Sequence, residues 1–181
     1  MGSGVYQTKG SLQKGTGQGL GSFYWMSASG GVEVEVDKET GETRIIKYVG
    51  IVDAGKVINP VNVEQQNIGS VVMALGQTFT ERMIYDNKGL LLNPNFVDYK
   101  TPTVKDLPDE IVVSPLEVTN PKGPYGAKGI GEVMIVPPMP AIANALYQAT
   151  GVRFKDLPIT QEKILQKLIE MEGRKIGDKE D

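Results

Sequence analysis

The sequence predicts an α+β domain with two layers, one made of helices and one formed by a mostly antiparallel sheet. Residues 31–36 alternate Val with Glu, which is the period of a half-buried strand. A turn-forming run at 37–41 separates this strand from a more apolar one at 44–52, so the two predict a hairpin. A stretch with helical periodicity follows them, and 181 residues fit one domain.

The first predicted helix begins at Asn59 and runs to near Glu81. Asn at the N-cap followed by Pro60 at the first helical position is a typical helix start. Apolar side chains recur on one face of this helix at Ile68, Val72, Leu75 and Phe79. Gly69 and Gly76 each cost roughly 1 kcal/mol relative to Ala inside a helix. We therefore expect close packing contacts at both glycines.

The second half of the chain predicts shorter elements. Residues 86–89 are typical of a hairpin turn, and 111–116 of a further strand. Residues 141–150 predict a helix, and Thr160 caps a last helix with Ile164, Leu165 and Leu168 facing the core. Residues 93–108 contain three prolines and form a long loop, which either shapes a site or is a surface loop without a role.

The domain is expected to span residues 31–172. Residues 1–30 are rich in glycine, with several Ser and Thr, and predict a partly mobile segment. Residues 173–181 are charged and poor in apolar side chains, so we expect a frayed end.

The composition favours a cytoplasmic protein and narrows the possible chemistry. The net charge of −3 comes from interspersed charges, so nucleic acid is not an expected partner. No apolar run approaches the ~20 residues that a membrane span needs, and the first residues lack the order of a signal peptide. Cysteine and histidine are absent. Any catalysis by this chain must therefore use carboxylates, Lys, Tyr or a cofactor, and any iron–sulfur clusters must lie on other chains.

The strongest functional signal is the run Gly-Pro-Tyr-Gly-Ala-Lys-Gly-Ile-Gly-Glu at residues 123–132. Its glycines let the backbone pass close to a ligand. The run ends in Glu132 just before an apolar stretch, and a carboxylate in apolar surroundings is a candidate general base. A glycine-rich turn with a solvated Glu is an equally weighted alternative. The spacing matches neither the dinucleotide nor the P-loop phosphate motif.

Residues 123–132 resemble the G-A-K-G-x-G-E signature of the molybdenum-binding subunit of the xanthine dehydrogenase and aldehyde oxidase family. Residues 53–60 resemble the family's D-x-G-x-x-I/V-N-P turn, and 66–69 stand where the family has G-Q-I-E-G. Residues 144–160 match its usual C-terminal run. The resemblance covers roughly residues 15–168 in the family's order, so the chain is identified as similar to the C-terminal portion of that subunit.

The resemblance implies a molybdopterin-binding domain with Glu132 as the catalytic base. The backbone of the glycine loop would face the pterin, while Lys128 fixes the loop or meets an anionic group. Gln66 would contact the pterin through its amide, although Gln65 and Ile68 replace the family's usual Gly and Glu beside it. The implied cofactor-binding set is Gln66, Gly126, Ala127, Lys128, Gly129, Ile130 and Gly131. No protein ligand to the metal is implied.

The implied reaction oxidises an aldehyde or an N-heterocycle, with water as the oxygen source. A G-G-x-F-G segment and a second glycine-rich pterin loop are not found, and in the family both belong to the N-terminal half. We therefore expect half of an active site, with no cofactor on this chain alone. The expected partners are that N-terminal half and iron–sulfur and flavin subunits. The alternative is a non-catalytic isolated domain that forms homo-oligomers.

Overall fold

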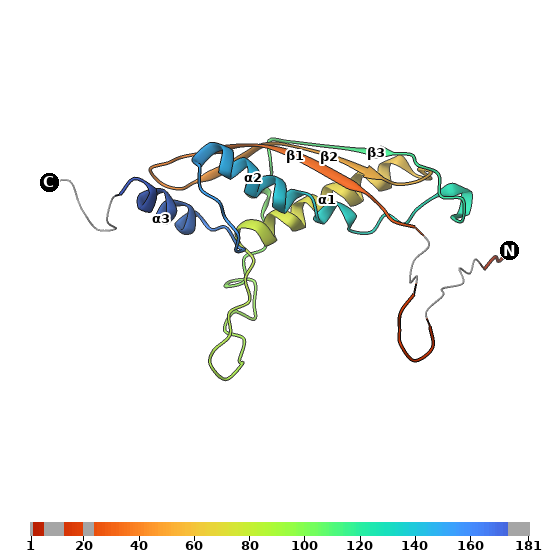
Figure 1. Ribbon diagram of the computed structural model, residues 1–181, viewed down its shortest axis with the longest axis horizontal. Helices are drawn as coiled ribbons and strands as arrows, with labels where there is room; N and C mark the ends of the chain where they lie inside the picture. The colour runs from red at the N-terminus through yellow and green to blue at the C-terminus, as the bar shows by residue number, and fades with distance from the viewer. Residues whose placement is uncertain (1, 6–12, 20–23, 174–181) are drawn as a thin grey trace.

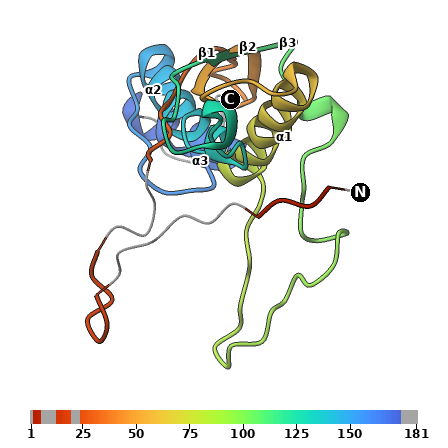
Figure 2. The same cartoon turned by 90° about the vertical axis from the view of Figure 1, so that its right-hand side faces the viewer.

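The computed structural model describes residues 2–5, 13–19 and 24–173, which form a two-layer α+β fold (Figure 1). A three-stranded sheet forms one layer, and α1 and α2 cover one of its faces, as both views show (Figure 2). The strands are β1 Ala28–Val36, β2 Thr43–Asp53 and β3 Glu110–Leu116. The helices are α1 Pro60–Phe79, α2 Pro138–Thr150 and α3 Gln161–Met171. Three short 3-10 helices are η1 Val104–Asp106, η2 Pro124–Gly126 and η3 Val133–Ile135. The predicted fold class is confirmed. The predictions for residues 6–12, 20–23 and 174–181 lie outside the described residues.

The predicted hairpin is confirmed as the antiparallel pair β1–β2, with Val36 opposite Thr43. Its turn forms because the Asp37 side chain accepts hydrogen bonds from the backbone N–H groups of Glu39 and Thr40, at 2.8 and 3.2 Å. Gly41 closes the turn with φ +75°, which favours glycine.

The third strand differs from the expectation of a mostly antiparallel sheet. β3 pairs with β2 in parallel, from Lys47 opposite Glu110 to Asp53 opposite Leu116. Parallel neighbours need a long crossover, and α1 with the segment after it provides one. β2 and β3 therefore end at the same edge of the sheet, where the loops that follow them meet.

Helix α1 begins as predicted, because the Asn59 side chain accepts a hydrogen bond from the Asn62 N–H at 3.2 Å. The expected close contact exists at Gly76, where a Cβ would lie 2.7 Å from the Pro102 side chain. The expectation for Gly69 is wrong, since no described atom lies within 4 Å of the place of its Cβ. The buried face of α1 is Asn67, Ser70, Val71, Ala74, Leu75, Gly76 and Thr78.

The core has two clusters beneath the sheet. The larger one joins β2 and all three helices through Ile45, Leu75, Ile142, Leu146, Val152, Ile159, Ile164 and Leu168. The smaller one consists of Tyr48, Val52, Val71 and Met134. Met134 belongs to η3, and the Tyr48 hydroxyl donates to its sulfur at 3.4 Å, so the smaller cluster supports the end of the glycine loop.

Residues 81–103, here called the arm, leave the end of α1 and extend away from the two layers in both views (yellow-green in Figures 1 and 2). The predicted turn at 86–89 is confirmed, since the Asp86 carboxylate accepts from the N–H groups of Lys88 and Leu90, both at 2.8 Å. Apolar side chains on the arm are exposed, among them Phe96 at 83% and Val97 at 74%. In the described part of the chain no helix is long and apolar enough to cross a membrane.

Candidate functional site

The two motif loops meet where the parallel strands β2 and β3 end. The Ala54 N–H donates to the Leu116 carbonyl at 3.0 Å, and the Lys128 N–H donates to the Ala54 carbonyl at 3.1 Å. Gly55 and Ala127 form an isolated antiparallel bridge. The D-x-G turn and the G-A-K-G segment are therefore hydrogen-bonded neighbours. The carboxyl end of parallel strands is a usual place for a ligand.

The first half of the glycine loop is a tight turn that requires its glycines. A Cβ on Gly123 would lie 2.0 Å from the Ala127 carbonyl oxygen. Gly126 has φ +84°, and its carbonyl accepts from the N–H groups of Asn120 and Lys56, both at 2.9 Å. Tyr125 also lies in the left-handed region, with φ +57° and a side chain that is 90% exposed.

The Lys128 side chain is directed toward β2 and forms an ion pair with Asp53, the last residue of that strand. Both side chains are buried, and Asp53 also accepts from the Gly55 N–H at 3.1 Å. Burial by itself raises the pKa of the Asp53 carboxyl, but hydrogen bonds from Lys128 and Gly55 and the charge of Lys128 hold that pKa below its usual value. Of the two expected roles for Lys128, this geometry fits fixing the loop.

The second half of the loop, residues 129–132, presents its backbone outward. The Gly131 carbonyl accepts from the Gln66 amide at 2.8 Å, so α1 holds this end of the loop. The N–H groups of Ile130, Gly131 and Glu132 donate to no described residue. A Cβ on Gly131 would meet no described atom within 4 Å. The loop thus offers a row of backbone donors, which suits a ligand rich in acceptor atoms.

Glu132 lies at the start of η3 and is exposed. The apolar surroundings expected from the following residues are not found around its carboxylate. The reason is that the chain turns at η3, so that Met134 enters the core while Glu132 stays outside. Its side chain makes no hydrogen bond or ion pair with a described residue. It is therefore available to a substrate, and no contact in the described part of the chain requires it.

Sequence reasoning missed Asp53 and Tyr24 as parts of this site. The Tyr24 hydroxyl accepts from the Gly129 N–H at 3.1 Å, ahead of β1. No pattern around Tyr24 indicates this contact. Asp53 begins the D-x-G turn and Lys128 lies in the G-A-K-G segment. Their opposite charges in two motifs of one site could have indicated the ion pair. Among the described residues, no three acidic, His or Cys side chains gather to hold a metal ion.

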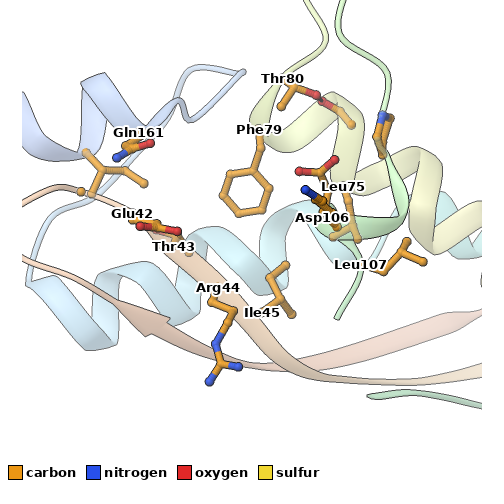
Figure 3. Close-up of a pocket in the computed structure, with 15 residues that line it drawn as sticks. Glu42, Thr43, Arg44, Ile45, Leu75, Phe79, Thr80, Asp106, Leu107 and Gln161 are labelled. Carbon is orange, nitrogen blue, oxygen red and sulfur yellow. Dashed lines mark hydrogen bonds between the residues drawn. The ribbon is translucent and has the colours of Figure 1, made fainter. Parts of the chain in front are cut away.

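A cavity of about 360 Å³ lies at the other end of α1, away from the glycine loop. It opens between the start of β2, the end of α1, η1 and the start of α3 (Figure 3). Ile45, Leu75 and Phe79 give it an apolar floor. The buried Thr43 hydroxyl beside it has no partner among the described residues. No residue of the glycine loop lines this cavity.

Comparison with known proteins decides the family. A family model described as a molybdopterin cofactor-binding domain matches residues 1–108. The chain belongs to this family. The matched part of the molybdopterin cofactor-binding domain includes the D-x-G turn and Gln66, and ends before the glycine loop.

Relatives of this molybdopterin cofactor-binding domain match a larger share of the chain than the family model does. The aldehyde oxidoreductase molybdenum-binding subunit PaoC of Escherichia coli is 37% identical over 162 residues, 87% of this chain and 22% of that protein. The 6-hydroxypseudooxynicotine dehydrogenase complex subunit gamma of Paenarthrobacter nicotinovorans is 34% identical over 138 residues, 75% of this chain and 17% of that protein. The chain thus spans about a fifth of the length of these relatives.

Solved structures agree with the family. The aldehyde oxidoreductase from Desulfovibrio desulfuricans superposes with a TM-score of 0.78 at 30% identity, over 88% of this chain and 17% of that one. Quinoline 2-oxidoreductase from Pseudomonas putida gives a TM-score of 0.71 at 36% identity, over 77% of this chain and 18% of that one. The resemblance to the xanthine dehydrogenase and aldehyde oxidase family is confirmed.

Proposed function

We propose that this chain contributes one wall of the cofactor site of a molybdenum hydroxylase, and that this wall carries the general base. The observation that supports the proposal best is the convergence of two motif loops at one end of the parallel strands. There the backbone donors at 130–132, which pair with no described residue, form a row that ends at Glu132. Family membership supplies the class of cofactor, molybdopterin.

The donors of the loop fit such a cofactor, because a pterin with its phosphate offers several acceptor atoms. Ile130 and Gly131 would contact it through their backbone N–H groups, and Gly129 through its backbone carbonyl, since its N–H already binds Tyr24. Gln66 would contact it through its amide oxygen, since its amide nitrogen already binds Gly131. Gly126, Ala127 and Lys128 would hold the loop in shape from behind. When bound, the cofactor supplies the two-electron redox chemistry.

Glu132 then accepts a proton at its carboxylate from the water-derived oxygen nucleophile that attacks an aldehyde or an N-heterocycle. Its side chain is exposed in this chain, and the N-terminal half of the subunit would close over it and exclude water. The proposal accordingly includes that half as a partner, together with iron–sulfur and flavin subunits. Taken alone, the chain holds no cofactor and turns over no substrate.

The test is Glu132→Gln in the assembled enzyme, with Glu39→Gln as the control. Glu39 is an exposed carboxylate in the β1–β2 turn, so its change should leave the rate alone. We expect Glu132→Gln to lower kcat by roughly 10²- to 10⁴-fold, the range of general acid–base catalysis, with molybdenum content unchanged. Turnover of the Gln variant near the parent rate would remove Glu132 from the mechanism.

A further inference from the structure

The Asp53–Lys128 ion pair differs from every other ion pair between described residues. Its side chains are 10% and 8% exposed, whereas each side chain of the other pairs is at least 39% exposed. It also joins residues 75 positions apart in the chain, at the junction of the two motif loops. A buried pair at this place needs a physical reason.

Stability alone is a weak reason. Removing two charges from water is costly, and an apolar pair of similar volume is often as stable or more stable. A buried charge pair instead fixes one arrangement of the groups that it joins, because separating them would leave each charge buried without an opposite charge. Here Asp53 is fixed further by the Gly55 N–H, and Lys128 also donates to the Trp25 carbonyl at 3.5 Å.

The pair lies where it controls the path of the loop to Glu132. Lys128 stands four residues before Glu132, and its own N–H is bonded to Ala54 after β2. The other end of the short span is held by Gln66 at Gly131. Residues 129–131 run between these two anchors. The attachment of Lys128 to Asp53 of β2 therefore determines the position of Glu132 and its carboxylate.

We propose that Asp53 and Lys128 are positioning residues for Glu132 and that Lys128 contacts no ligand. This inference rests on the proposed function of Glu132. It separates Lys128 from the residues that would bind the cofactor, because its ammonium group is directed at β2 and is buried there. The pair acts through the backbone of the loop.

The experiment compares single and double changes. Asp53→Asn and Lys128→Met each leave one buried charge without its partner, so each should destabilise the chain. Asp53→Leu combined with Lys128→Met removes both charges and should restore the unfolding midpoint. The matched control is Lys47→Met with Glu110→Gln, since this exposed pair also involves β2 and joins it to β3 at the start of their pairing, away from the glycine loop.

Two readouts separate positioning from stability. In the chain alone, hydrogen exchange of the backbone amide at position 128 should be at least tenfold faster in the Asp53→Leu/Lys128→Met variant than in the parent, with amides of the β1–β2 pair unchanged. In the assembled enzyme the same variant should lose roughly 10²-fold in kcat with KM and cofactor content unchanged, since about 1 Å of misplacement costs that much. The control should match the parent in both readouts.

Different outcomes test the positioning role of the ion pair and the proposed function of Glu132. Full turnover of the double variant, in an enzyme that Glu132→Gln inactivates, overturns the positioning role and leaves the proposed function standing. Full turnover of Glu132→Gln overturns the proposed function itself. A double variant as unstable as the single ones also overturns the inference, because the pair would then be a structural stabiliser.

Discussion

Lys128 and Glu132 lie four positions apart in one motif, yet the structure gives them opposite surroundings. Lys128 is buried against Asp53, and Glu132 is exposed at η3. Sequence reasoning found both residues, because a charged side chain in a glycine-rich run is conspicuous. It did not find which of them is buried, because burial depends on β2, which lies far away in the chain.

The first prediction concerns Tyr48, a fully buried tyrosine of β2. Burial raises its pKa to about 12 from an ordinary value of 10.0. Its contribution to stability is therefore complete below pH 10, where the unfolded chain also keeps the proton, and is lost as pH rises towards 12. An ultraviolet titration of the seven tyrosines should show a late phenol at about pH 12 that Tyr48→Phe removes. The hydrogen bond from its hydroxyl to Glu81 also raises the pKa of Tyr99, and Tyr48→Phe should leave that phenol unchanged.

The control for this titration is Tyr125→Phe. Tyr125 is 90% exposed, so its replacement should leave the late step in place. If all phenols of the folded protein titrated together near their ordinary value, the hydroxyl of Tyr48 would not be buried as described.

Among the helices and strands, the sequence predicted the turns and helix starts correctly but not the parallel pairing of β3 with β2. The Asp37 turn, the Asn59 cap and the start of α3 at Thr160 are decided by neighbouring residues, so the sequence predicted them. A strand at 111–116 was predicted too, but its alternation is the same for either direction of a partner. Its parallel pairing to β2 depends on how the crossover through α1 packs. The site depends on that pairing, so the meeting of the loops was not predicted.

The second prediction concerns the tight turn of the glycine loop. Gly123→Ala would place a Cβ 2.0 Å from the Ala127 carbonyl oxygen, and overpacking of this kind costs about 1–3 kcal/mol. Gly131→Ala meets no described atom within 4 Å and should change the free energy of unfolding by less than about 0.5 kcal/mol. Urea unfolding of the two variants measures the difference. Equal loss in both would contradict the turn described for residues 123–127.

The whole molecule has a well-packed centre and an apolar arm that nothing described covers. Two buried clusters join the sheet to the helices, while the arm carries exposed Met83, Ile84, Tyr85, Leu90, Leu92, Phe96 and Val97. The sequence indicated a long loop here from its prolines. It could not indicate the exposure, because apolar side chains in a loop are usually covered by another part of the fold.

The third prediction is that the chain alone associates with itself in solution. Contiguous apolar surface of more than a few hundred Å² usually finds a partner. Sedimentation at micromolar concentrations should give a dimer or a larger species, and Phe96→Ser with Val97→Ser should shift it towards monomer. Asp98→Asn, an exposed polar change beside them, is the control. A parent chain that sediments as a monomer throughout this range would count against the role given to the arm.

The parallel pairing of β2 with β3 also bears on the order of folding. The β1–β2 hairpin pairs strands that are close in the chain. β3 is separated from β2 by α1 and the arm, so its pairing with β2 closes a much longer loop. Non-local pairing of this kind forms slowly, because loop closure costs entropy before any contact repays it. Asp53 meets Lys128, and Gly55 meets Ala127, only after that step. A chain that has folded only its hairpin therefore lacks the junction of the two motif loops. Under the proposed function, we expect a cofactor to bind only after this junction has formed.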